Sequence, residues 1–133
     1  MKKLTIAIIV GFIATFITNT ILAIIIIGPL FNEKIGIGRN PEKDGLNFPA
    51  ILFGYFALTI FIVWLTTILT NKNWLQKGII AGGATGLAVF VAGHSIVAGW
   101  SVADAGAMII AGIIDSLAAI VGGITIAFIL RNR

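Results

Sequence analysis

Four long apolar runs follow one another along the chain, separated by shorter polar segments. They cover residues 4–27, 48–70, 75–100 and 102–130, and Lys and Arg are absent from all but the ends of these runs. A helix needs about 20 mostly apolar residues to cross the hydrocarbon core of a bilayer. Strands of a membrane β-barrel would instead alternate over roughly ten residues. The pattern predicts an all-α polytopic membrane protein with four transmembrane helices in an antiparallel bundle.

Composition narrows the class of protein further. Hydrophobic residues make up 59% of the 133 positions and charged residues 11%, whereas soluble domains are nearer half apolar and a quarter charged. A small domain cannot hide this much apolar surface from water. The values exclude a soluble enzyme, a disordered tail and a nucleic-acid-binding module, despite the net charge of +4. We expect a single domain over residues 1–133 with the lipid bilayer as its surroundings.

The start of the chain resembles a secretory signal peptide, because Met1, Lys2 and Lys3 precede an apolar run. A small-x-small cleavage site is missing at the right distance, and the apolar run continues through residues 24–27. We therefore expect a retained membrane helix.

Basic residues are distributed unevenly between the two sides of the predicted bundle. One side carries six basic residues and no acidic ones: Lys2, Lys3, Lys72, Lys77, Arg131 and Arg133. The other side carries three basic residues offset by acidic ones: Lys34, Arg39 and Lys43 against Glu33, Glu42 and Asp44, with Asp104 nearby. Since positive loops resist translocation, both termini are expected in the cytoplasm, in a multi-pass protein of the cell membrane.

Residues 28–47 form the one sizeable predicted loop, on the outer side. Turns are expected at three places: Pro29, Asn40–Pro41 and Asp44–Gly45. Asn47 is expected to cap the second membrane helix, with Pro49 in its first turn. The loop could be a solvated connection or a surface for a partner, such as another membrane subunit.

Small residues recur at four-residue spacing on the last two membrane helices. The expected packing positions are Gly78, Gly82, Gly86 and Gly93 on the third, and Gly112, Ser116 and Gly123 on the fourth. Small residues let helix backbones approach closely in lipid. They predict a tight hairpin of these two helices, a homo-oligomer, or both, since a second small stripe follows on the third helix: Thr85, Ala88, Ala92, Ser95 and Gly99.

Ionisable residues inside a membrane are costly and suggest function. His94 and Asp115 lie inside the predicted spans, and Asp104 lies near the outer end. The helical rise places Asn19, Tyr55 and His94 roughly 8–12 Å below the outer surface and Asp115 roughly 18 Å deep. We predict an outward-facing polar crevice that is lined by Asn19, Tyr55, His94 and Ser95. Asp104 would lie at its mouth and Asp115 would form its floor. Small residues beside Asp115 would leave room for water or a small ligand: Ala111, Ala118 and Gly122.

Two functions fit these residues. In the first, Asp115 and His94 exchange protons on a pathway for a proton, cation or small solute. In the second they hold helices together: Asp115 bonds Asn19, Thr18 or Thr59, and His94 bonds Tyr55. The cytoplasmic half offers only lone threonines, which are expected to bond their own helix: Thr5, Thr66, Thr67, Thr85 and Thr125. A half-channel or binding pocket is therefore favoured over a complete pore.

Enzymatic chemistry finds little support. One His and no Cys cannot assemble a typical zinc site, and Asp104 and Asp115 lie three helical turns apart, too far for paired acid–base work. A phosphate-binding Gly loop is not found, because Gly82–Gly83 lies within a membrane span. We expect no enzyme activity, no metal and no cofactor.

The last two spans carry a Gly-rich helix, a Gly-Trp turn at Gly99–Trp100 and an acidic residue midway along the final helix, at Ile114–Asp115–Ser116. Together with Gly86–Leu87, His94–Ser95 and Gly122–Gly123, this half of the chain resembles small four-helix bacterial membrane proteins of unknown function. The resemblance implies a fold and no activity. The expected function is a transport- or channel-like membrane protein, or alternatively a non-catalytic scaffold or accessory subunit.

Overall fold

The computed structural model describes residues 2–36 and 45–131, which are helical apart from short connections. The helical elements are α1 (Lys2–Leu22), η1 (Ala23–Ile27), α2 (Gly28–Ile35), α3 (Phe48–Ile68), α4 (Trp74–Gly86), η2 (Leu87–Val91), α5 (Ala92–Trp100) and α6 (Ala105–Leu130), where η1 and η2 are π-helical segments. They form four continuous helices that are long and apolar enough to cross a membrane: Lys2–Ile35, Phe48–Ile68, Trp74–Trp100 and Ala105–Leu130. The expected all-helical architecture is confirmed.

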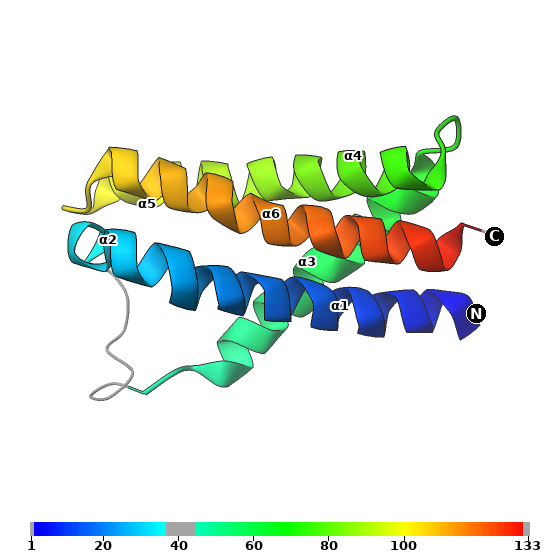
Figure 1. Cartoon of the computed structure of the whole chain (residues 1–133), viewed down its shortest axis with the longest axis horizontal. Coiled ribbons are helices and arrows are strands. Elements are labelled where there is room, and N and C mark those ends of the chain that lie inside the picture. The colour runs from blue at the N-terminus through cyan, green and yellow to red at the C-terminus, as the bar shows by residue number, and fades with distance from the viewer. Residues whose placement is uncertain (1, 37–44, 132–133) are drawn as a thin grey trace.

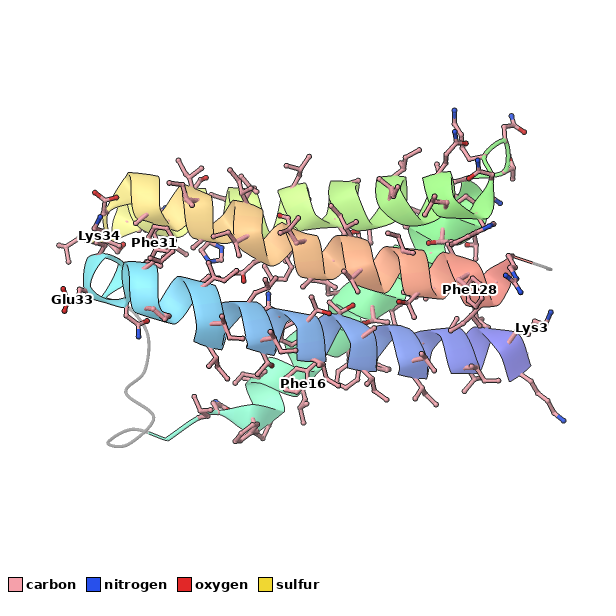
Figure 2. All side chains as sticks on the ribbon, viewed as in Figure 1. Lys3, Phe16, Phe31, Glu33, Lys34 and Phe128 are labelled. Atoms are coloured by element: carbon pink, nitrogen blue, oxygen red, sulfur yellow. The ribbon has the colours of Figure 1, made fainter. Side chains whose placement is uncertain are left out.

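Successive helices run in opposite directions, so that the start of α1 and the end of α6 lie at the same end of the molecule (Figure 1). We call this the basic end, after its lysines and arginine. Glu33 and Lys34 lie at the opposite end, far from Lys3 (Figure 2). The backbone N–H of Asp104 donates to the carbonyl of Lys34 at 3.0 Å, which ties the end of α2 to the start of α6.

The first helix is longer than the sequence pattern predicted. The expected loop begins at residue 28, but the helix continues through α2 to Ile35 and ends at Gly36, whose φ is 62°. Pro29 lies in the first turn of α2, so the turn expected there is wrong. Pro cannot donate a backbone hydrogen bond and clashes with the carbonyl four residues earlier. The wider turn of η1 immediately before it relieves this conflict, as π segments do in membrane helices.

Three other predictions for the outer loop, at Gly45, Asn47 and Pro49, agree with the structure. Asn47 caps α3 as expected, since its side chain accepts from the N–H of Ala50 at 3.2 Å, and Pro49 follows in the first turn. Gly45 has a φ of 63°, as a turn residue would. Asn40–Pro41 and Asp44 lie outside the described residues.

Helix α6 is the centre of the bundle. It contacts every other helical element and lies between α1 and α4 (Figure 1). In the apolar 18-residue stretch of α6, half of the residues are buried inside the protein. The corresponding share is 28% or less in each of the other three membrane-length helices.

Glycines bring the backbones of α4 and α6 into direct contact. A Cβ at Gly78 would lie 2.6 Å from the Cα of Ile124, and one at Gly82 would overlap the carbonyl of Ala119. On the facing helix, a Cβ at Gly123 would overlap the carbonyl of Gly78. Such distances are below any real contact, so only glycine fits, and the predicted tight hairpin is confirmed.

The same packing continues toward the outer end of the hairpin. Gly86 faces Ser116, with a Cβ position 2.7 Å from the serine Cβ, and Gly112 faces the carbonyl of Phe90 at 2.8 Å. Gly93 differs from the prediction, because a Cβ there would meet nothing within 4 Å. Gly93 therefore takes no part in the close packing of the hairpin.

Helix α1 packs on another small face of α6. Gly11 faces the side chain of Ile126, and Gly122 faces Thr15 so closely that a Cβ would overlap the Thr15 hydroxyl. This corrects the expectation that Ala111, Ala118 and Gly122 leave room for a ligand. The two alanines are fully buried, and α1 occupies the space beside Gly122.

Helix α3 is buried only along its second half. Its buried residues all lie between Leu58 and Thr66, and its first half diverges from α2 (Figure 1). Neither α2 nor α5 contains a buried residue. Toward the basic end, α1 and α4 thus pack tightly on α6, whereas at the opposite end the bundle is open between α1–α2 and α3.

We predict that Gly82→Ala destabilises the protein by about 1–3 kcal/mol, because the added methyl group meets the α6 backbone. The matched control is Gly83→Ala, one residue away, where a Cβ has open space. The free energy of unfolding in detergent micelles measures both variants. Equal loss of stability in the two would contradict the packing described for α4 and α6.

Candidate functional site

Three polar side chains from three helices meet near the middle of the bundle, on the side away from the basic end. The Asn19 Nδ2 of α1 donates to the Asp115 Oδ1 of α6 at 2.9 Å. The His94 Nε2 of α5 lies 3.5 Å from the other carboxylate oxygen, Asp115 Oδ2. Asn19 and Asp115 are buried, whereas the His94 side chain is 27% exposed. We call Asn19, His94 and Asp115 the polar cluster.

The second ring nitrogen of His94 determines which nitrogen carries a proton. His94 Nδ1 lies 2.8 Å from the carbonyl oxygen of Phe90, one turn earlier. A carbonyl can only accept, so Nδ1 must carry a hydrogen to bond it. In the neutral ring, Nε2 is then an acceptor.

The unprotonated Nε2 of a neutral His94 ring would face the Asp115 carboxylate at 3.5 Å. An unprotonated Nε2 and an ionised carboxylate are both acceptors and would repel each other. A proton on either Nε2 or Asp115 removes the repulsion, giving an imidazolium–carboxylate pair or a neutral imidazole–acid pair. The geometry therefore favours one proton held between His94 and Asp115, while Asn19 stabilises the remaining carboxylate oxygen.

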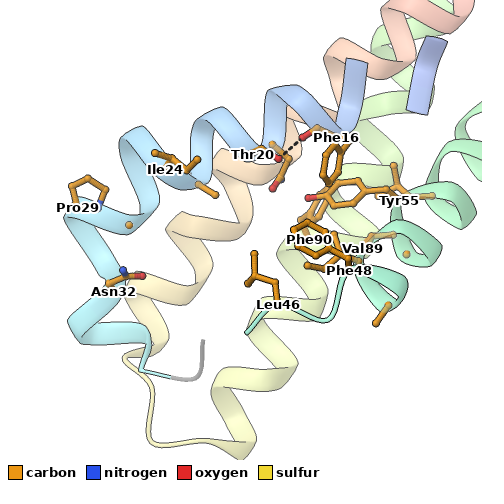
Figure 3. A pocket seen from close by; sticks show the side chains of 17 residues that line it. Phe16, Thr20, Ile24, Pro29, Asn32, Leu46, Phe48, Tyr55, Val89 and Phe90 are labelled. Atoms are coloured by element: carbon orange, nitrogen blue, oxygen red, sulfur yellow. Dashed lines mark hydrogen bonds between the residues drawn. The ribbon is translucent and has the colours of Figure 1, made fainter. Parts of the chain in front are cut away.

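A cavity of about 1070 Å³ opens beside the polar cluster, between α1–η1–α2 and the diverging half of α3 (Figure 3). Asn19 and Asn32 both line it, and within residues 2–36 and 45–131 its lining contains no charged side chain. The Tyr55 hydroxyl points into it, and the Tyr55 ring packs edge-on against Phe16 with centroids 5.3 Å apart. The site is a largely apolar, aromatic cavity with polar groups at its inner end.

Both π-helical segments border this cavity. Ala23 and Ile24 of η1 line one side, and Val89 and Phe90 of η2 line another. Segment η1 starts four residues after Asn19, and η2 ends three residues before His94. Such segments occur frequently at functional sites.

The structure assembles the predicted crevice only in part. Asn19 and Tyr55 line the cavity and Asp115 lies behind Asn19, but the cavity lining does not include His94, Ser95, Asp104 or Asp115. The Ser95 hydroxyl donates to the Val91 carbonyl of its own helix at 2.7 Å, because that acceptor is one turn away. Asp104 caps α6 by accepting from the Ala107 N–H at 2.6 Å, so the mouth assigned to it is corrected to a helix cap.

The interhelical bonds proposed for the same residues are also partly present. Asp115 bonds Asn19, one of its three expected partners. His94 bonds Phe90 in place of the expected Tyr55. Threonines toward the basic end bond carbonyls of their own helices, as expected: Thr66, Thr67, Thr85 and Thr125.

Asn19 is one of the three partners predicted for Asp115, but that prediction did not use the spacing of residues in α1 that selects it. The buried residues of α1 are Ala7, Gly11, Thr15 and Asn19, one every four positions. That spacing of small and polar residues in an apolar helix was a readable signal. In contrast, the bond of His94 to the Phe90 carbonyl could not be predicted from the sequence, because every residue has a backbone carbonyl. Among residues 2–36 and 45–131, the structure brings no three His, Cys, Asp or Glu side chains together.

We predict that ¹⁵N NMR will show His94 Nδ1 protonated throughout the stable pH range, since it bonds the Phe90 carbonyl. The chain has one histidine, so histidine labelling reports this site alone. Asp115→Asn should shift the Nε2 signal by removing its partner. The control is Asp104→Asn, which removes the other aspartate of α6 but keeps a capping residue. An unprotonated Nδ1 at neutral pH would refute the assignment.

Comparison of the chain with protein-family models found no match, and the searches of curated proteins and of solved structures found none either.

Proposed function

We propose that this chain is a small multi-pass transport protein that exchanges a proton for a small cation at the polar cluster. Asp115 is the proton- and cation-binding group, His94 shares its proton, and Asn19 orients the carboxylate. The single observation that carries the proposal is the His94–Asp115 contact with Nδ1 of His94 bound to a backbone carbonyl.

The cavity supports a cation as the transported solute. The part of its lining that the structure describes carries no positive charge, and the aromatic residues Phe16, Tyr55 and Phe90 can attract a cation through their ring faces. Asp115 lies behind Asn19 at its inner end. A cation that reaches the carboxylate would compete with the proton shared by His94.

The site is better described as an outward pocket than as a complete pore. Toward the basic end, the hydroxyl groups of Thr66 and Thr85 donate to carbonyls of their own helices. In that half, glycines also hold the backbone of α4 tightly against α6. Transport would therefore require a rearrangement that opens this half, as in alternating access.

A second candidate function is a non-catalytic scaffold or accessory subunit. It is favoured by the Asn19–Asp115 bond, which joins α1 to α6 across 96 positions of sequence. In this function the polar cluster fixes helix register and no solute enters. Self-association would use outward glycines with open space around them, such as Gly83, Gly93 and Gly99.

The proposed location is the cell membrane with both termini in the cytoplasm. The support is the distribution of basic residues: Lys2, Lys3, Lys72, Lys77 and Arg131 lie at the basic end, with no acidic residue in the flanking segments. The cavity would then open toward the outer side.

Proton flux in proteoliposomes tests the transport proposal. Vesicles contain a pH-sensitive dye and are acidic inside, and ethidium is the external cation probe. We expect the protein to accelerate collapse of the pH gradient when ethidium is added. Asp115→Asn should lower the rate at least about tenfold, because it removes the proton-binding group. His94→Gln should lower it as well.

Ser95→Ala is the matched control, since Ser95 neighbours His94 but bonds its own helix. It should transport as the parent does. If a folded parent protein collapses the gradient neither with ethidium nor without it, the transport proposal fails. Loss of stability in Asp115→Asn and Asn19→Ala would then support the scaffold.

The orientation can be tested with single introduced cysteines, because the chain contains none. Glu33→Cys and Asn71→Cys place exposed thiols at opposite ends of the molecule. A membrane-impermeant maleimide on intact cells should label Glu33→Cys and should label Asn71→Cys only after permeabilisation. The reverse pattern would overturn the proposed topology.

A further inference from the structure

A second cavity, of about 880 Å³, lies at the basic end of the bundle. It is bordered by the starts of α1 and α4, the second half of α3 and the end of α6. It is separate from the polar cluster, and the proposed transport function does not use it. Three cationic residues line it: Lys72, Lys77 and Arg131.

The cations come from three different segments of the chain. Lys72 lies between α3 and α4, Lys77 in the first turn of α4 and Arg131 directly after α6. Among the described residues, no acidic side chain lines the cavity, and neither lysine forms an ion pair. The Arg131 guanidinium lies 4.1 Å from the centre of the Phe128 ring, and it forms no ion pair with a carboxylate of the described residues. Like charges gathered around one cavity repel one another, so an anion at its rim lowers their energy.

The remaining lining of this cavity is mostly apolar and reaches toward the middle of the molecule. Ile8 follows the start of α1 by six residues, and Ile60 precedes the end of α3 by eight. At the helical rise these positions lie about 9 and 12 Å inward from the helix ends. Trp64 and Trp74 also line the cavity, and tryptophan is enriched where membrane meets water.

A cationic rim above an apolar groove matches an amphiphile with an anionic head. We propose that this cavity is a binding site for an anionic phospholipid of the adjacent leaflet. Its phosphate lies among Lys72, Lys77 and Arg131, and an acyl chain follows the groove between α1 and α3 past Ile8 and Ile60. Basic pockets between membrane helices bind anionic headgroups in this manner. A free phosphate would satisfy the rim but leave the apolar groove unfilled.

Native mass spectrometry of the purified protein in detergent tests the site. Phosphatidylglycerol and phosphatidylcholine with identical acyl chains are the probes, and glycerol phosphate is the headgroup without chains. We expect phosphatidylglycerol to bind in preference to the other two. The double variant Lys72→Gln/Lys77→Gln should weaken its binding roughly tenfold or more, because each cation near an anionic lipid contributes about fivefold. Lys34→Gln, at the opposite end, should bind as the parent does.

A second variant tests the groove without changing any charge. Ile60→Trp places a larger side chain in the acyl-chain path and should weaken phosphatidylglycerol binding while all cations remain. Equal binding of phosphatidylcholine, or full binding by the double lysine variant, would overturn the proposal. Equal binding of glycerol phosphate, or no effect of Ile60→Trp, would show a phosphate site without the acyl chain and overturn the lipid assignment.

Discussion

The fold depends on how closely the backbone of α6 approaches its neighbours. In lipid, helices gain little by covering apolar side chains, so close van der Waals contact must hold them together. Gly78 and Gly82 of α4 face Gly123 and the adjoining backbone of α6 without intervening side chains. On another face, Gly122 of α6 receives Thr15 of α1. A helix with two small faces can hold two neighbours, and this makes α6 the centre.

The same constraint explains where the bundle opens. The one glycine of α3, Gly54, packs against no neighbour, since a Cβ there would meet nothing within 4 Å, and the buried residues of α3 begin at Leu58. Its first half diverges, which leaves the cavity lined by Asn19 and Tyr55. Asp115 lies where the tight half of α6 meets this open half. Its carboxylate is thus held by two helices while remaining close to a cavity.

Most of the fold could be predicted from the sequence, and less of the site. Apolar length locates the four helices, and the four-residue spacing of small residues identifies the α4–α6 contact, because both signals are local. Asp104 and Ser95 were misassigned for the same reason: each has a bonding group within four residues along its own helix. A polar side chain that hydrogen-bonds a nearby backbone group of its own helix does not need a partner in a cavity.

What the sequence by itself determined is the number of membrane-length helices, the cap of α3 at Asn47 and the uneven distribution of basic residues. Only the tertiary structure decided that Asn19 meets Asp115, that Phe90 directs the His94 ring and that α3 stands apart. The continuation of α1 through Pro29 also depended on it. These features depend on helix rotation and on contacts between residues up to 96 positions apart. A one-residue change in rotation turns a side chain by about 100°, and spacing alone cannot specify it.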